Sequence, residues 1–420
     1  MAEENRRIEP LHLDTARIGR LCPASLEVLE SFGRFLARNG RIPSFSAVLE
    51  DGFGALPNEY QTDFPALSVW KGLRALQDDI AMCAEAGSGA FVAFSAQSAA
   101  LMVFAAHVLG RKARKILCTD LEFPLLQRVL SRVQEQYGGT LEVLPLRHLI
   151  EGERYDAAAI AKRIVDFYVQ NDCEAIVISQ ITQEGIRIPC ESIIKTLRML
   201  DSSCLVMVDG AQSLELEFTG NVASQADIYF GVTHKWMEGA SLGLAIAPRE
   251  TSVGIVKATL KDMVDEYLIT DPYLRLIAHA SGLSDERIYE TISLEQLFVS
   301  AAAVRIALSR KPEERTQRYD AYRDFTFKID DLTSRLDCNV RRRDSELRTG
   351  IALVDWPKSI TGMARDFEAE LGKAGIVVTG LTDRSVRISA PTTTLFQEDW
   401  QTIHRALELA NKDKSAAGHA

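Results

Sequence analysis

The chain has 420 residues, of which 46% are hydrophobic and 25% charged, and its formal net charge is −10. These proportions are normal for a globular protein, and the length allows two or three domains or one large α/β unit with an appendage. The mildly acidic charge argues against a surface for nucleic acid or anionic membrane, and no apolar stretch reaches the length of a transmembrane helix.

The N-terminus and the cysteines both bear on the compartment in which the protein is expected. The stretch "MAEENRRIEPLHLD" lacks the apolar core of a signal peptide. The seven cysteines are scattered, and no CxxC pair occurs among them. This usage predicts reduced, mostly buried thiols in a cytoplasmic protein, and it predicts no metal site.

Short apolar runs alternate with helical patterns through the first two thirds of the chain. An extended arm leads into a helix over residues 12–40, and the order strand, turn, helix then occurs over residues 90–110, 114–138 and 174–200. A further strand ends at Asp209. Such alternation predicts βαβ units and a mostly parallel sheet.

The pattern changes near Thr291, where a long helix is predicted. Beyond it, "TGIALVDW", "ARDFEAELGKAG", "IVVTG" and "SVRISAP" alternate between strand and helix patterns. They indicate a smaller α+β domain. We therefore divide the chain into an N-terminal arm (1–30), a large domain (31–290) and a long helix with a small C-terminal domain (291–420).

Two side chains follow neighbouring predicted strands in the large domain. Asp209 ends the apolar run of "CLVMVDGAQSLELEF". A carboxylate there points into the cleft where open α/β sheets bind ligands, or it caps a following helix. Lys235 follows a second strand in "ADIYFGVTHKWMEGASLG", and Trp236 and Met237 cover it. A buried lysine suits Schiff-base chemistry, and a carboxylate can keep a pyridine nitrogen protonated, so the pair meets the needs of a pyridoxal phosphate site.

"VMVDGAQS" followed by "ADIYFGVTHKWMEGASLG" resembles the signature of fold-type I pyridoxal phosphate enzymes. Within them it resembles the class V aminotransferase group, which includes cysteine desulfurases, kynureninases and isopenicillin N epimerase-like enzymes. The resemblance extends over nearly the whole chain, from about His12 to Pro391. It implies an α/β fold with a large, mostly parallel sheet and a smaller C-terminal α+β domain, and it implies pyridoxal 5'-phosphate as cofactor.

The resemblance assigns a role to each residue that matches the motifs. It implies that Asp209 pairs with the pyridine nitrogen and that Gln212 donates to the phenolic oxygen of the cofactor. It implies that Lys235 holds the aldehyde carbon and later shuttles protons at the substrate. His234, next to it, would approach the phosphate, although a histidine can also be purely structural.

The phosphate and the ring face need further contacts. Ser95, Ala96 and Gln97 stand where a strand turns into a helix, and the free N–H groups of a helix start bind anions, although an ordinary N-cap is the alternative. The glycine usual in the family is missing from this turn, and Val232 replaces the usual hydroxyl three residues before the lysine. Phe123, which precedes a proline as in kynureninases, would stack on the pyridine ring unless it is a core residue.

Two residues of the second half of the chain complete the implied site. Arg387, on an alternating strand pattern, matches an arginine that binds the substrate's α-carboxylate, and we prefer it to Arg384 on the preceding loop. A surface ion pair is the alternative for Arg387. Thr291 matches a threonine that reaches the phosphate bound by the other subunit, which implies a homodimer with a shared active site.

The sequence departs from the cysteine desulfurases in one respect that bears on chemistry. Those enzymes carry a nucleophilic cysteine on a loop before the last strands, and "GIVVTGLTDRSVRIS" contains none. Cys338 lies well before that loop, and we expect it to be structural. Persulfide chemistry is therefore disfavoured.

We expect a pyridoxal phosphate enzyme that acts at the α-carbon of an amino acid with free amino and carboxylate groups. A lyase or epimerase-like reaction is preferred, and a class V aminotransferase is the alternative. A non-catalytic relative is a third hypothesis, which predicts loss of the lysine or the aspartate. A dehydrogenase is disfavoured because no G-x-G-x-x-G follows a predicted strand.

Overall fold

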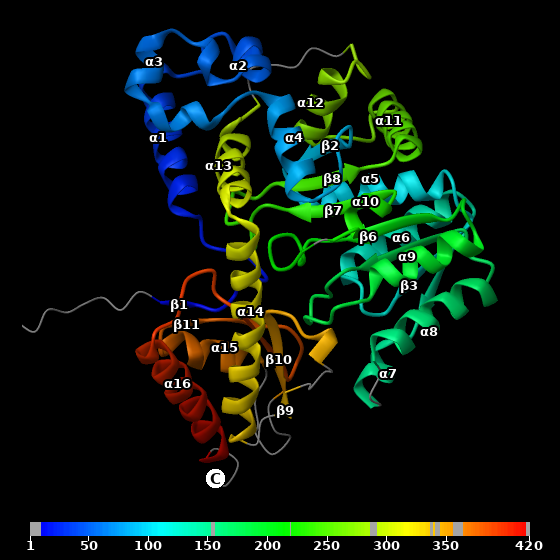
Figure 1. Cartoon of the computed structure of the whole chain (residues 1–420), viewed down its shortest axis with the longest axis vertical. Helices are drawn as coiled ribbons and strands as arrows, with labels where there is room; N and C mark the ends of the chain where they lie inside the picture. Colours follow the sequence, from blue (N-terminus) through cyan, green and yellow to red (C-terminus); the bar gives the residue numbers. More distant parts are fainter. Residues whose placement is uncertain are drawn as a thin grey trace, which may run out of the picture. The chain divides into compact units, whose positions relative to one another are not determined.

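The computed structural model describes residues 10–152, 156–218, 220–285, 292–336, 339–340, 345–355 and 364–416. The chain divides into two compact units (Figure 1). The larger unit takes in residues 21–183 and 187–312, and the smaller unit takes in residues 1–20, 184–186 and 313–420 as far as they are described.

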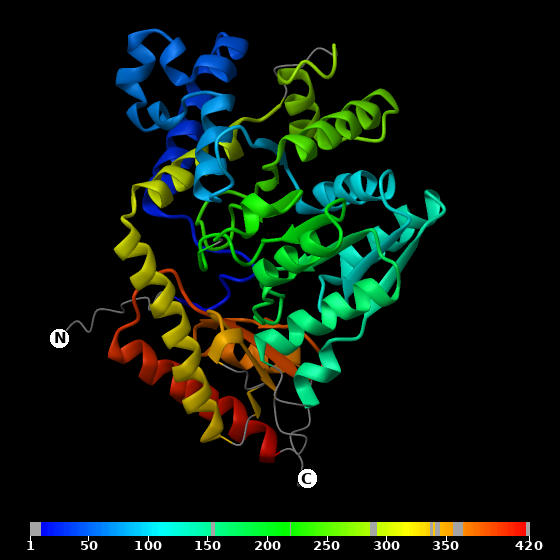
Figure 2. The same ribbon diagram turned by 45° about the vertical axis from the view of Figure 1, so that its right-hand side comes forward.

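A seven-stranded sheet forms the centre of the larger unit (Figures 1 and 2). Its strands, in spatial order, are β2 (Phe91–Ser95), β8 (Gly243–Ala247), β7 (Ile228–Val232), β6 (Leu205–Asp209), β5 (Ala175–Ser179), β3 (Lys115–Thr119) and β4 (Thr140–Leu144). Strand β8 runs antiparallel to β7 and β2, and the remaining neighbours are parallel. The predicted mostly parallel α/β fold is therefore confirmed.

The central strands are apolar at nearly every position because helices cover the sheet. Every residue of β2, β5, β7 and β8 is buried, which is typical of strands covered on both faces. Helices α5 and α6 pack against each other, as do α8 and α9. The helices of this region are α4 (Leu73–Cys83), α5 (Ser98–Gly110), α6 (Pro124–Gln136), α7 (Arg147–Gly152), α8 (Ala157–Gln170), α9 (Cys190–Leu200), α10 (Val222–Gln225), α11 (Glu250–Asp265) and α12 (Pro272–Ala280).

An aromatic core joins the first helices of the larger unit to its last helix. Phe298 stacks on Trp70 with ring centroids 4.9 Å apart and contacts Phe32 at 5.1 Å. These contacts hold helices α1 and α13 together. The elements around this core are α1 (Pro23–Asn39), α2 (Phe45–Asp51), η1 (Phe53–Ala55), α3 (Asn58–Asp63), η2 (Pro65–Val69) and α13 (Glu295–Ser309).

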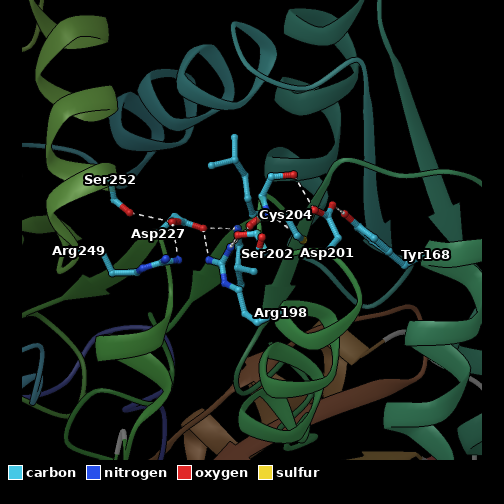
Figure 3. A network of polar contacts seen from close by, with 11 residues as sticks. Tyr168, Arg198, Asp201, Ser202, Cys204, Asp227, Arg249 and Ser252 are labelled. Atoms are coloured by element: carbon cyan, nitrogen blue, oxygen red, sulfur yellow. Dashed lines mark hydrogen bonds and ion pairs between the residues drawn. The ribbon is translucent and has the colours of Figure 1, made fainter.

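The amino ends of β6 and β7 carry a network of polar contacts (Figure 3). Asp227, directly before β7, accepts hydrogen bonds from the Ser252 hydroxyl and the Val206 amide, each at 2.8 Å. Its carboxylate also pairs with Arg198 and with Arg249, whose Nη1 lies 3.2 Å away. The network ties α9 and α11 to this edge of the sheet.

The smaller unit is an α+β structure. Its antiparallel sheet has the order β12 (Thr379–Gly380), β13 (Ser385–Ser389), β10 (Ile351–Asp355), β9 (Asn339–Val340). A second, parallel pair joins β1 (Leu11–His12) to β11 (Ile376–Val377). The remaining elements are α14 (Pro312–Ser334), η3 (Ser345–Leu347), α15 (Ala364–Lys373) and α16 (Gln397–Ala416).

Two details of the second half of the chain differ from the predicted pattern. The strand predicted over 376–380 is divided into β11 and β12, because the first half pairs with β1 and the second with β13. The region after Thr291 holds two helices, α13 and α14, with Arg310 and Lys311 between them. In the part of the chain that is described, no helix has both the length and the apolar character needed to cross a membrane.

Candidate active site

The carboxyl ends of strands β2 to β7 lie at one edge of the large sheet, because β4 also runs parallel to β3. Strands β3, β5, β6 and β7 run parallel, and β2 has the same direction because two antiparallel steps separate it from β7. The residues at or just after these ends are Ser95, Thr119, Ser179, Asp209, His234 and Lys235. Ligands of open α/β sheets bind at such an edge.

Asp209 is buried at the end of β6, where it is 8% exposed. Its Oδ1 accepts the amide of Ala211 at 2.9 Å. Burial raises the pKa of Asp209, while the Ala211 amide and the positive charge of Lys235 act in the opposite direction. The turn after the strand needs a glycine, because a Cβ at Gly210 would lie 2.1 Å from the ring of Tyr229.

The loops after β6 and β7 contact each other through Gln212 and Trp236. The indole Nε1 of Trp236 donates to Oε1 of Gln212 at 3.3 Å, and both side chains are buried. Gln212 follows Asp209 by three residues, and Trp236 directly follows Lys235. The contact therefore connects the loops that carry the two side chains singled out in the sequence.

His234 has a buried ring nitrogen that lacks a hydrogen-bond partner among the described residues, Nδ1. Burial, and secondly the charge of Lys235, lower its pKa to about 4. The imidazole is therefore neutral near pH 7 and carries one N–H donor. Thr233 does not replace the hydroxyl missing at Val232, because its Oγ1 donates to the Ala240 carbonyl at 2.5 Å and lies 3.1 Å from Oγ of Ser300.

The turn between β2 and α5 is held by a carboxylate from elsewhere in the chain. Oδ2 of Asp271 accepts the Ser95 hydroxyl at 2.9 Å and the Ala96 amide at 3.0 Å. Oδ1 of the same side chain caps α12 through the amides of Tyr273 and Leu274. The Gln97 amide donates to Oγ of Ser95 at 3.1 Å. The Ser95 hydroxyl and the backbone amides of Ala96 and Gln97 are thus engaged within the protein.

Phe123 stands at the N-cap of α6, before Pro124, and is 41% exposed. A phenylalanine so exposed is not a core residue. Its neighbour Glu122 is only 1% exposed, and sequence reasoning missed it. Oε1 of Glu122 accepts the Thr119 hydroxyl at 3.0 Å, and Oε2 accepts the Ser179 hydroxyl. Burial raises the pKa of Glu122 to about 8, and the charge of Asp209 adds to the shift. The signal was a lone acidic residue inside the otherwise apolar "LEFPLL".

Arg387 lies on β13 of the smaller unit, opposite Leu353 and Thr379. It is 6% exposed, and its Nη2 lies 3.4 Å from Oδ1 of Asp14. Burial lowers the pKa of Arg387, and Asp14 partly offsets the effect. Arg384 lies in the turn before the strand. The guanidinium is therefore not on a surface, and its ion pair with Asp14 is internal to this unit.

Two residues considered in the sequence fall outside the described part of the chain. They are Thr291, proposed to reach a partner's phosphate, and Cys338. The structure gives no account of either.

Comparison with known proteins identifies the fold. No family model and no curated protein matches the sequence. Solved structures do match it. They include the ureidoglycine–glyoxylate aminotransferase of Bacillus subtilis, with TM-score 0.68, 15% identity, and 96% of this chain and 93% of that chain covered. They also include the cysteine desulfurase of Thermococcus onnurineus, with TM-score 0.69, 15% identity, and 96% and 95% covered.

A third match is a C-DES variant with glycine covalently linked to its PLP cofactor, at TM-score 0.66 and 14% identity, with 96% of this chain and 97% of that chain covered. The chain therefore has the fold of the matched aminotransferase and cysteine desulfurase, as the sequence motifs predict. Because both kinds of enzyme have this fold, the likeness does not distinguish between their reactions.

Proposed function

We propose that this chain is a pyridoxal phosphate-dependent enzyme that acts on an amino acid. One observation carries the proposal: Asp209 and Lys235 follow neighbouring parallel strands at the ligand-binding edge of this fold, and the charge of Lys235 acts on the buried carboxylate. A non-catalytic relative would have no need to keep both groups.

The residues at the ring end of the site fit the cofactor. Bound pyridoxal phosphate would supply an aldehyde for a lysine amine and a protonated ring that withdraws electrons from the substrate's α-carbon. Asp209 would hold the proton on the ring nitrogen, and Gln212, three residues beyond it, would donate to the phenolic oxygen of the same ring. The exposed Phe123 would cover the ring face.

The phosphate end fits only in part. His234 offers a buried nitrogen without a protein partner. The first amides of α5, those of Ser98 and Ala99, have no acceptor inside the helix and suit an anion. The donors of Ser95 and Ala96, which the sequence assigned to the phosphate, are held by Asp271. Phosphate binding by these two residues would require Asp271 to release them.

Lys235 would exchange a proton with the α-carbon of the substrate. We favour a lyase or epimerase-like reaction, with aminotransfer as the alternative. Phe123 separates the chain from the cysteine desulfurases, because Phe123 followed by Pro124 resembles the kynureninase pattern and a phenylalanine cannot pass protons as the histidine of a desulfurase might. The lack of a cysteine in residues 376–389 argues against a desulfurase. We also propose that the enzyme is a homodimer in which Thr291 reaches the partner's cofactor and that Arg387 binds the substrate carboxylate.

The proposal is tested with purified protein and pyridoxal phosphate. The loaded protein should absorb near the wavelength of a lysine-bound cofactor, and borohydride should fix the cofactor on the peptide that contains Lys235 and Trp236. Lys235→Ala is the control and should give no labelled peptide. Labelling of another lysine, or no labelling of the wild type, would contradict the assignment.

The reaction type is tested by a screen of amino acids. Absorbance changes identify substrates, and analysis of the products separates elimination, epimerisation and aminotransfer. Sulfide release from cysteine, abolished by Cys338→Ala, would show that excluding desulfurase chemistry is wrong.

A further inference from the structure

Arg310 connects the two loops that carry the candidate active site. It follows the last residue of α13, and its guanidinium forms one ion pair with each loop. Nη1 lies 2.6 Å from Oε2 of Glu215, in the loop after Asp209. Nη2 lies 3.5 Å from Oε2 of Glu238, in the loop after Lys235. One side chain therefore bridges two segments that the sheet alone does not join.

The contacts are largely removed from solvent. The side chains of Glu215, Glu238 and Arg310 are 1%, 10% and 15% exposed. A buried carboxylate is stable only when it is paired and hydrogen-bonded. The two glutamates therefore constrain Arg310, and Arg310 constrains them.

Both glutamates also have unusual backbone conformations. Their φ angles are +66° for Glu215 and +62° for Glu238, in the left-handed region that non-glycine residues rarely adopt. Such conformations persist only where surrounding contacts enforce them, and they concentrate at functional sites. In the Lys235 loop the constraint is adjacent to the lysine, since the Glu238 amide donates to the Lys235 carbonyl at 3.2 Å.

A neighbouring arginine shows what a purely structural ion pair on the same helix looks like. Arg305 lies on α13 and pairs with Asp79 of α4 at 3.2 Å. Its ion pair joins two helices and involves neither loop. Arg305 therefore serves as the control: its loss affects the packing of two helices, whereas the loss of Arg310 also affects the two loops.

We infer that Arg310 is a positioning residue for the candidate active site. By holding Glu215 and Glu238 together, it sets the spacing of the two loops and so aligns the Lys235 amine with the Asp209 carboxylate. The Trp236–Gln212 contact, at 3.3 Å, is the second point at which the loops are joined. The effect of Arg310 on cofactor binding rests on the proposed function. Its effect on the spacing of the two loops rests on the ion pairs alone.

The first test concerns the loops and needs no cofactor. Hydrogen exchange is measured by mass spectrometry on the wild type, Arg310→Ala and Arg305→Ala. Arg310→Ala should speed exchange in peptides covering both residues 210–217 and 233–242, and Arg305→Ala should leave these peptides unchanged. Equal exchange in all three proteins would overturn the inference. If Arg310→Ala does not fold, Glu238→Gln replaces it, because it weakens one pair and keeps the side-chain shape.

The second test uses pyridoxal phosphate alone as the probe. The pH midpoint of the cofactor's absorbance change depends on the alignment of the lysine with its neighbours. Arg310→Ala should shift this midpoint by about one unit, equivalent to tenfold in proton affinity, and Arg310→Lys should restore part of the shift because a single ammonium can still reach one glutamate. Arg305→Ala should show the wild-type midpoint.

The outcomes separate the inference from the proposed function. A wild type that gives no absorbance band contradicts the proposed function, while the exchange result still decides whether Arg310 joins the loops. A wild-type midpoint in Arg310→Ala, accompanied only by a lower melting temperature like that of Arg305→Ala, would show that Arg310 is structural and would overturn the inference.

Discussion

Glu122 is a buried carboxyl group that accepts hydrogen bonds from the hydroxyls of Thr119 and Ser179, and the Ser179 backbone also acts on it. The negative charge of Asp209 acts on Glu122 and raises its pKa. A charge on Glu122 would in turn raise the pKa of the Cys118 and Cys190 thiols. An ionised carboxylate in such surroundings is costly, so the neutral acid is the favoured form. In the proposed site, the negative charge would then belong to Asp209, beside the positive charge of Lys235.

This state predicts a dependence of stability on pH. The pKa of Glu122 is raised from an ordinary value of 4.5 to about 8, so the folded chain binds the proton more tightly than the unfolded chain. The stabilisation is fully present below about pH 4.5 and is lost as pH rises towards about pH 8, by at most about 1.4 kcal/mol per pH unit. Glu122→Gln should lack this loss, since the amide does not ionise.

The measurement is urea denaturation of the wild type and Glu122→Gln across this pH range. The contributions of other titrating groups to the pH dependence cancel when the unfolding free energies of the two proteins are subtracted. Glu135→Gln, at an exposed position of α6, is the matched control and should follow the wild type. Parallel curves for wild type and Glu122→Gln would mean that Glu122 does not bind a proton in the folded state.

Asp271 is a second acidic residue that bears on the site, because it occupies the Ser95 hydroxyl and the Ala96 amide. Its charge opposes a phosphate at this turn. Asp271→Asn keeps an oxygen that caps α12 and removes the charge. We expect pyridoxal phosphate to bind on the order of tenfold more tightly, about 1.4 kcal/mol, in a fluorescence titration. Weaker binding would indicate instead that Asp271 orients the donors.

At the scale of elements, the two edges of the large sheet have different chemistry. The polar groups at the carboxyl edge include Asp209 and an orphaned nitrogen of His234. At the amino edge, Asp227 is matched by two arginines, a hydroxyl and an amide (Figure 3). A carboxylate with so many donors serves the fold, while a buried ring nitrogen without a partner among the described residues is available to contact a ligand.

We therefore expect a substitution at the amino edge to lower the stability of the fold and to leave pyridoxal phosphate binding unchanged. Asp227→Asn removes the charge that compensates Arg198 and Arg249, and we expect a loss of about 2–4 kcal/mol of unfolding free energy. Binding of pyridoxal phosphate should stay at the wild-type level. Urea denaturation measures the first quantity and absorbance the second. Asp201→Asn, in the same network but closer to solvent, should lower the unfolding free energy much less. A large loss of cofactor affinity in Asp227→Asn would contradict this division.

The sequence predicts the elements that carry Asp209 and Lys235 because each follows an apolar run that ends abruptly. It does not predict what holds them. Asp271 is 176 residues from Ser95, and Arg310 is 95 residues from Glu215. Neither local periodicity nor capping preference reports on contacts at such separations. Glu122 is missed for a different reason. An acidic residue near a helix start is usually exposed, and this expectation outweighs the apolar residues that surround Glu122 in the sequence.

At the scale of the whole molecule, the fold is shared with enzymes at 14–15% identity. A pattern of burial is enough to specify such a fold, whereas the reaction depends on a few side chains. Among these, Arg387 is the residue proposed to recognise the substrate. Its strand belongs to the smaller unit, and Asp14 of the same unit already holds the guanidinium. A substrate carboxylate would therefore share Arg387 with Asp14 or displace it.

Arg387→Ala should raise KM by the equivalent of about 1.5–3 kcal/mol for any amino acid found active in the screen, because a charge-assisted contact is lost. Arg387→Lys should recover only part, since an ammonium cannot form two parallel hydrogen bonds with a carboxylate. Arg384→Ala, in the turn before the strand, is the control and should have little effect on KM.

Asp14→Asn shows whether the substrate carboxylate shares the Arg387 guanidinium with Asp14 or displaces Asp14 from it. If the substrate displaces Asp14, the variant frees Arg387 and lowers KM. If the two carboxylates share the guanidinium, the variant leaves Arg387 less firmly placed and raises KM. In both cases amines that lack the α-carboxylate should react equally poorly with the wild type and Arg387→Ala. Greater sensitivity at Arg384, or good turnover of such amines by the wild type, would show that Arg387 acts only within the fold of the smaller unit.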